Sequence, residues 1–160
     1  MRTAAPAATK AEEELATAIA GTAEESGDYI FRAMVEDNGM PKLGTSATTL
    51  GIRKGRDIVP DAAGMVHRPQ FIPGQPNGLS CADSIQGIPQ IVCPAAWGGR
   101  HHSTLMWKIS VGDLGSELTA GKDGSTHVSV GPSMSMPFDE FVRAIQSTRP
   151  KWHKVSKGGN

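Results

Sequence analysis

The sequence lacks the features that mark several large classes of protein. It has no run of about 18 apolar residues, so no segment is predicted to cross a bilayer as a helix, and its first twenty residues lack the continuous apolar stretch of a secretory signal. Lysine plus arginine and aspartate plus glutamate number 16 each, which gives no strong signal for nucleic acid or an anionic membrane. We therefore expect a cytoplasmic protein, whose export would use a secretion system that reads no signal peptide.

Cysteines are also scarce. The two that occur, Cys81 and Cys93, are too few for a disulfide scaffold and lack the close C-x-x-C spacing of a structural zinc site. The tandem histidines His101 and His102 do not complete a metal site, because neighbouring histidines cannot easily ligate one ion together. We expect two free, packed thiols and no metal.

Glycine and proline are plentiful, with 19 and 11 residues, whereas aromatic residues make up only 5% of the chain. This composition favours many short elements over a helical bundle. Local patterns predict short strands at 29–35, 57–59, 65–67, 105–111, 117–119 and 127–130. A helix is predicted between Pro137 and Pro150, where apolar residues recur at i, i+3, i+4 and i+7. The fold class that follows is α+β.

The chain is predicted to hold one functional domain with an extension at each end. Residues 1–27 form an N-terminal extension, in which 11–20 have the alanine, leucine and glutamate content of a short helix. The domain covers 28–152, and the basic, glycine-ended segment 153–160 is predicted to be a flexible tail.

A glycine- and proline-rich run, Pro73–Asp83, delivers the hydroxyl of Ser80 into the start of a short apolar segment. Gly78 lies just before this segment, and a glycine there lets the backbone turn tightly or approach a ligand closely. We therefore expect Ser80 near the floor of any site.

Arg32 is a charged residue in the centre of an apolar strand. An unpaired buried charge is costly, so the side chain needs a partner. A salt bridge, or a packed stem whose head reaches water, would satisfy it structurally. An anion would satisfy it functionally, because a guanidinium presents donors that fit a phosphate.

Several chemistries could use these polar residues. A serine hydrolase would combine Ser80 with His127, but no G-x-S-x-G elbow surrounds the serine. A metal-independent ribonuclease could use His127 with His101 or His102 as acid and base. An arrangement of Arg32, Ser80 and His127 on three separate strands would instead suit a nucleotide cleft.

A set of short motifs occurs here in the order in which a family of bacterial toxins carries them. The motifs are Tyr29–Ala33, Met40–Gly44 with Leu50–Arg53, Asn77–Ser80, and Thr126–His127 with Pro132–Pro137. Over residues 28–152 the chain resembles the NAD-dependent effector toxins of type VI secretion, whose fold is similar to that of the ADP-ribosyltransferases.

This resemblance implies an ADP-ribosyltransferase-like split β-sheet core with few short helices, in which two small sheets meet at a cleft for NAD. Arg32 matches the first-strand arginine that contacts the phosphate and ribose of the cofactor. Ser80 matches the serine that braces the cleft and positions the nicotinamide ribose, and Gly78 belongs to the same cofactor-binding segment. A toxin of this kind would inhibit growth from the cytoplasm of a target bacterium and would be restrained by an immunity or antitoxin protein.

The sequence departs from the ADP-ribosyltransferase pattern at one catalytic position. Those enzymes place a glutamate on a late strand to stabilise the oxocarbenium-like transition state. Here Gly131 follows Val130, and the next glutamate after it is Glu140. His127 is the candidate to contribute in its place, with Ser80 as the second catalytic candidate. A histidine-dependent ribonuclease toxin and a non-catalytic interaction module that docks on a target remain the alternatives.

Overall fold

The computed structural model describes residues 28–156. Residues 1–27 and 157–160 lie outside this part, and so does the helix predicted at 11–20. Within the described part no helix is long and apolar enough to cross a membrane.

The chain divides into two units. They are Met1–Tyr29 with Ser110–Gly112, and Ile30–Ile109 with Asp113–Asn160. In the first unit, the amide of Val111 donates a hydrogen bond of 2.9 Å to the carbonyl of Asp28. The second unit contains helix α1 and nearly all of the sheet.

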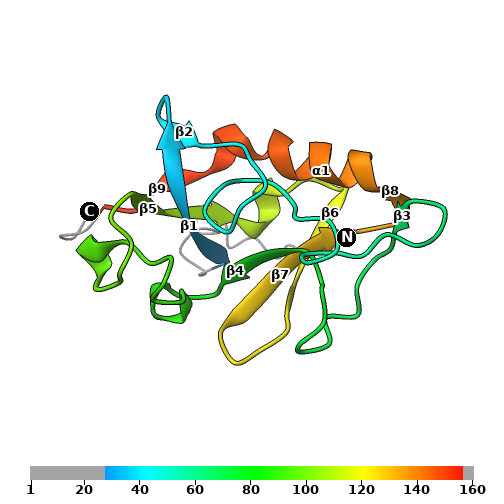
Figure 1. Cartoon of the computed structure of the whole chain (residues 1–160), viewed down its shortest axis with the longest axis horizontal. Coiled ribbons are helices and arrows are strands. Elements are labelled where there is room, and N and C mark those ends of the chain that lie inside the picture. The colour runs from blue at the N-terminus through cyan, green and yellow to red at the C-terminus, as the bar shows by residue number, and fades with distance from the viewer. Residues whose placement is uncertain (1–27, 157–160) are drawn as a thin grey trace. The chain divides into compact units, whose positions relative to one another are not determined.

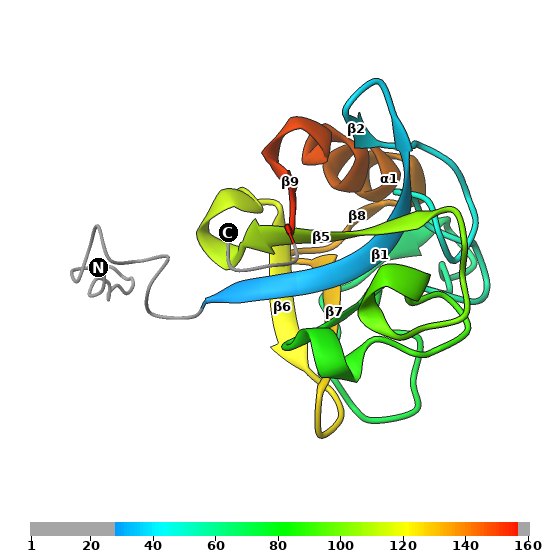
Figure 2. The ribbon, with the colours of Figure 1, turned by 90° about the vertical axis from the view of Figure 1, so that its left-hand side faces the viewer.

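Across residues 28–156, seven strands form one sheet in the order β6-β7-β4-β1-β5-β9, with β2 paired to β1 (Figures 1 and 2). The strands are β1 (Tyr29–Asp37), β2 (Met40–Pro41), β4 (Leu79–Ala82), β5 (Thr104–Ser110), β6 (Leu118–Lys122), β7 (His127–Pro132) and β9 (His153–Lys154). Strands β6, β7 and β4 pair antiparallel, as do β4 with β1 and β5 with β9.

A second, two-stranded sheet and one α-helix complete the regular structure of this part of the chain. Strands β3 (Met65–Val66) and β8 (Met136–Pro137) pair antiparallel, and β8 leads directly into α1 (Phe138–Ser147). Short 3-10 turns lie at Ile85–Gly87, Ala95–Trp97, Val111–Asp113 and Arg149–Lys151. The mixed, mostly antiparallel architecture confirms the predicted α+β class.

The alternation of side chains along the strands builds a core on both faces of the sheet. On one face, Trp107 and Ile109 of β5 pack with Phe141 and Ile145 of α1, which lies along this face in Figures 1 and 2. On the other face, Met106 belongs to a smaller cluster of buried residues, which are Ala33, Ala82, Ile88, Cys93 and Met106. The connection between β4 and β5 thus covers the second face, and the period of two predicted for 105–111 is confirmed.

Two details of the predicted organisation are wrong. Segment 57–59 is not a strand, because only the isolated bridge of Lys54 with Ile58 forms there. The predicted tail at 153–160 begins with β9, which pairs with β5 through Lys108 and His153. Strands β4 and β1 lie in the seven-stranded sheet, and β3 and β8 form the separate two-stranded sheet. The expected arrangement of two small sheets around an NAD cleft stays a prediction.

Candidate active site

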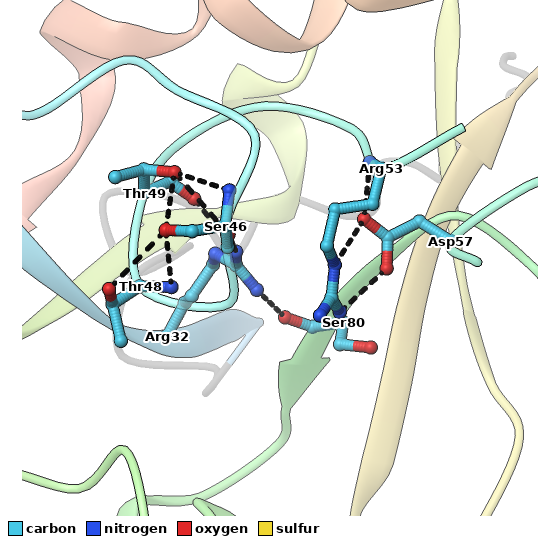
Figure 3. A network of polar contacts seen from close by, with 7 residues as sticks. All are labelled: Arg32, Ser46, Thr48, Thr49, Arg53, Asp57 and Ser80. Atoms are coloured by element: carbon cyan, nitrogen blue, oxygen red, sulfur yellow. Dashed lines mark hydrogen bonds and ion pairs between the residues drawn. The ribbon is translucent and has the colours of Figure 1, made fainter. Parts of the chain in front are cut away.

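Strands β1 and β4 are paired only where Phe31 lies opposite Ala82. The side chain of the next residue of β1, Arg32, also reaches β4. Nη1 of Arg32 donates a 2.7 Å hydrogen bond to the carbonyl of Ser80, as Figure 3 shows. The guanidinium therefore spans the place where the two strands diverge.

The other end of the guanidinium is held by the loop between β2 and β3. Nη2 of Arg32 donates to the carbonyl of Thr49 at 2.8 Å and, more weakly, to that of Ser46 at 3.4 Å. The Ser46 and Thr49 hydroxyls hydrogen-bond each other at 3.0 Å, and the Ser46 amide donates to Thr49 Oγ1 at 2.9 Å (Figure 3). This local network fixes the two carbonyls that face Arg32.

Arg32 is only 6% exposed, and among residues 28–156 its hydrogen-bond partners are carbonyls and not a carboxylate. Its Nε atom is buried and has no hydrogen-bond partner among residues 28–156. Burial lowers the pKa of Arg32, although Cys81 and Asp57 oppose this effect. A buried, positively charged side chain with an unused donor is therefore built into the sheet.

A pocket of about 200 Å³ opens beside Arg32, and it brings together the three residues singled out from the sequence, Arg32, Ser80 and His127. The other lining residues are Ala33, Ala47, Arg53, Arg56, Cys81, Ile88, Pro89, Ile91 and Val92. Three arginines and a histidine thus line the pocket, together with several apolar side chains and no acidic one. The pocket suits an anionic ligand that also has an apolar part.

The two arginines contributed by the loop between β2 and β3 differ in how they are held. Arg53 pairs with the carboxylate of Asp57, with Nη2 to Oδ1 at 2.9 Å and Nε to Oδ2 at 3.2 Å. Arg56 is exposed and has no ion-pair partner among residues 28–156. Sequence reasoning missed both arginines, although their spacing in the Arg53–Asp57 turn could have indicated a cationic loop.

Gly78 does not line the pocket. It is buried with a φ of +128°, and a Cβ atom placed on it would lie 2.0 Å from the carbonyl oxygen of Val130. Its amide also donates to the carbonyl of Asp57 at 2.8 Å. The close approach anticipated for this glycine is therefore made to strand β7.

His127 reaches the pocket from the first position of β7 and is oriented by Asp123. The two side chains meet with His127 Nδ1 2.5 Å from Asp123 Oδ1. The other carboxylate oxygen of Asp123 accepts from Ser129 Oγ at 2.6 Å and from Asn77 Nδ2 at 2.8 Å. Burial alone would raise the pKa of Asp123, but these hydrogen bonds outweigh it and lower the pKa.

Asp123 was not among the residues predicted from the sequence, because its place between Gly121 and Gly124 was interpreted as a hairpin turn. The turn exists, but it also folds Asp123 back onto His127, four residues later. An aspartate four residues before a histidine across a glycine turn is the signal that could have found the pair.

The tandem histidines lie away from this pocket. His101 and His102 line a separate pocket of about 390 Å³ with Trp97 and Lys154, so the structure does not bring a second histidine to His127. Cys81 and Cys93 are free and buried, and no cluster of three or more metal-ligating side chains occurs in the described part of the chain.

Comparisons of the chain with protein-family models, with curated proteins and with solved structures give no match. The pocket has a cationic wall, formed by Arg32, Arg53 and Arg56, a half-buried hydroxyl at Ser80 and a histidine with a buried carboxylate behind it.

Proposed function

We propose that this chain is an NAD-dependent toxin resembling the ADP-ribosyltransferases and that it binds NAD in the pocket lined by Arg32, Ser80 and His127. The observation that carries the proposal is the lining of the pocket, which includes three arginines, of which Arg53 is paired with Asp57, and no acidic side chain. A dinucleotide has a pyrophosphate that such a wall would bind, and planar rings that apolar side chains would contact.

Each part of the pocket has a role in this proposal. Arg53 is held in place by Asp57, and the exposed Arg56 is free to turn toward a ligand, so both would bind the pyrophosphate. Ile88 and Val92 would contact a planar ring. A volume of about 200 Å³ takes only part of a dinucleotide, so the remainder would lie over the exposed rim near Ile91.

Ser80 and His127 are the proposed catalytic residues. Ser80 lies on β4 with its carbonyl fixed by Arg32, and its half-buried hydroxyl would position the nicotinamide ribose. His127 would supply the polar group that the absent glutamate leaves missing. We place the action in the cytoplasm of a target bacterium, under the control of an immunity or antitoxin protein that covers the pocket.

Titration of NAD against the purified protein tests the binding, with Arg56→Ala as the site variant. Arg56 is exposed, so its removal should leave the fold intact while costing about 1.4 kcal/mol of phosphate contact, which is a tenfold weaker Kd. Arg100→Ala is the matched control, because Arg100 is also exposed and lies outside the pocket. The proposal fails if NAD does not bind, or if the two variants bind it equally well.

Expression in bacteria without a partner tests the toxicity. The wild-type chain should arrest growth, and Ser80→Ala should relieve the arrest without lowering the amount of folded protein. A ribonuclease would instead deplete RNA in a way that depends on His127 and is indifferent to NAD. Toxicity that survives substitution of Ser80, His127 and Arg56 would point to an interaction module.

A further inference from the structure

The environment of Asp123 determines which nitrogen of His127 is available to a ligand. A carboxylate accepts hydrogen bonds and cannot donate one, so His127 must carry its proton on Nδ1, the atom that faces Asp123. The lone pair of the neutral ring is then on Nε2, which has no hydrogen-bond partner among residues 28–156. Because His127 lines the pocket and its side chain is 44% exposed, Nε2 is the nitrogen that a bound molecule can meet.

Asp123 is itself held rigidly. Asp123 is 7% exposed, and its Oδ2 atom accepts hydrogen bonds from both Ser129 Oγ and Asn77 Nδ2. The Asn77 amide is fixed in turn, because it also donates to the carbonyl of Ile72 at 3.0 Å. A carboxylate with three donors stays ionised and keeps one orientation, so it fixes both the tautomer and the direction of the imidazole.

We propose that Asp123 is a positioning residue that holds His127 as a general base, and that this base serves a neutral O–H acceptor, either water or a hydroxyl group. The acceptor part of this inference rests on the proposed NAD-dependent function. The role of Asp123 rests on the geometry alone.

The charge of the pocket selects the acceptor. Arg32 and Arg56, which have no carboxylate partner among residues 28–156, would repel a cationic acceptor such as a guanidinium or an ammonium group, whereas the charge of Arg53 is offset by Asp57. A carboxylate acceptor is already ionised and has no proton for a base to remove. A neutral O–H group is the acceptor for which both the cationic wall and an unprotonated Nε2 are suited.

The proposed reaction transfers ADP-ribose from NAD to the oxygen of the acceptor. The acceptor oxygen forms a bond to C1′ of the nicotinamide ribose while its proton passes to Nε2 of His127. The bond from C1′ to the pyridinium nitrogen breaks, and its electron pair leaves with neutral nicotinamide. His127 then releases the proton to solvent, and the positive charge of the substrate ring ends as that proton.

The tautomer is measured by ¹⁵N NMR of the histidine side chains. In the wild-type protein, Nδ1 of His127 should show the shift of a protonated nitrogen and Nε2 that of an unprotonated one. In Asp123→Asn the new amide can donate to the ring, so the two shifts should exchange. A protonated Nε2 in the neutral wild-type ring would overturn the role given to Asp123.

The chain offers a matched control in a second aspartate and histidine pair outside the pocket. Asp61 Oδ2 lies 2.8 Å from His67 Nε2 on the exposed surface. Asp61→Asn makes the same chemical change in the same kind of pair. It should alter the signals of His67 alone and leave NAD turnover unchanged.

Nicotinamide release supplies the second readout. Asp123→Asn should lower kcat by about 10²- to 10⁴-fold, the size of a lost general base, with the Kd for NAD unchanged. His127→Ala should lose kcat to the same extent and recover part of it when imidazole is added to the buffer. Unchanged kcat in Asp123→Asn, or no recovery in His127→Ala, would overturn the inference.

Two small probes identify the acceptor class. Methanol should be incorporated as methyl ADP-ribose, whereas agmatine, which carries a guanidinium, should not be modified. Preferential modification of agmatine would overturn the choice of a neutral O–H group. If the wild-type protein binds no NAD, the proposed function fails together with the acceptor, while the ¹⁵N measurement still decides the role of Asp123.

Discussion

Replacing Gly78 by alanine should destabilise the fold much more than the same change at Gly74, four residues earlier. Both glycines have positive φ angles, +128° for Gly78 and +81° for Gly74. A Cβ on Gly74 would meet nothing within 4 Å, whereas one on Gly78 would lie 2.0 Å from the carbonyl oxygen and 2.7 Å from the carbonyl carbon of Val130. The pair therefore separates the cost of backbone strain from the cost of a clash.

The strain acts at both positions and costs about 1–2 kcal/mol for a residue with a Cβ. At Gly78 the clash must also be relieved by moving β4 away from β7, next to the register pair of Leu79 with Val130. Losing two backbone hydrogen bonds there adds about 2 kcal/mol, and the loosened packing of Leu79 adds more. We expect losses of about 1–2 kcal/mol for Gly74→Ala and about 3–5 kcal/mol for Gly78→Ala.

Urea unfolding followed by circular dichroism measures both free energies of unfolding. The comparison also tests the structural role given to Gly78, because a glycine that serves only a ligand would be replaceable without loss of stability. Equal stability of the two variants would refute the reasoning, since it would mean that β4 and β7 do not approach as closely at Gly78 as the structure has them.

Two further predictions concern buried ionisable groups. The folded pKa of Asp123 is below its ordinary value of 3.8, so this carboxylate stabilises the protein above that pH, and the stabilisation is lost as the pH falls through the folded pKa. Urea unfolding from about pH 6 to pH 3 should show this loss. The difference in stability between wild type and Asp123→Asn should shrink over the same range. Burial raises the pKa of the Cys81 thiol to about 12, so iodoacetamide at neutral pH should leave Cys81 unmodified in the native protein and alkylate it after denaturation. Alkylation of native Cys81, or a difference from Asp123→Asn that grows toward low pH, would contradict these assignments.

Ser80 and His127 lie on the same face of the sheet because side chains alternate between the two faces along each strand. In the antiparallel pair of β4 and β7, Ala82 lies opposite His127 and Ser80 opposite Ser129, so Ser80 and His127 project from the same face. Their apolar neighbours Leu79 and Val128 project into the core on the other face. Alternation along the two strands explains why these side chains share a face, but the pairing of β4 with β7 was not predicted from the sequence.

The cationic wall could not be predicted in the same way. Arg53 and Arg56 lie in irregular structure, and their approach to β4 depends on loop contacts such as the hydrogen bond from the Gly78 amide to the carbonyl of Asp57. Such contacts have no period in the sequence. Segment 57–59 shows the same limit, because its β-branched residues indicated a strand, whereas Asp57 is instead used to bind Arg53 in a turn.

The structure also changes what Arg32 can contribute to ligand binding. Both of its terminal nitrogens already donate to backbone carbonyls, and Nε is closed off from solvent, so Arg32 is poorly placed for the two-pronged phosphate contact that a free guanidinium makes. Its charge is not neutralised by these carbonyls, and in a buried setting that charge acts over a longer distance than it would in water. Arg32 would therefore attract an anion into the pocket and hold β4 in place, while direct contact with a phosphate would fall to Arg53 and Arg56. A strand arginine can in this way both hold a neighbouring strand in place and supply the positive electrostatic potential of the site.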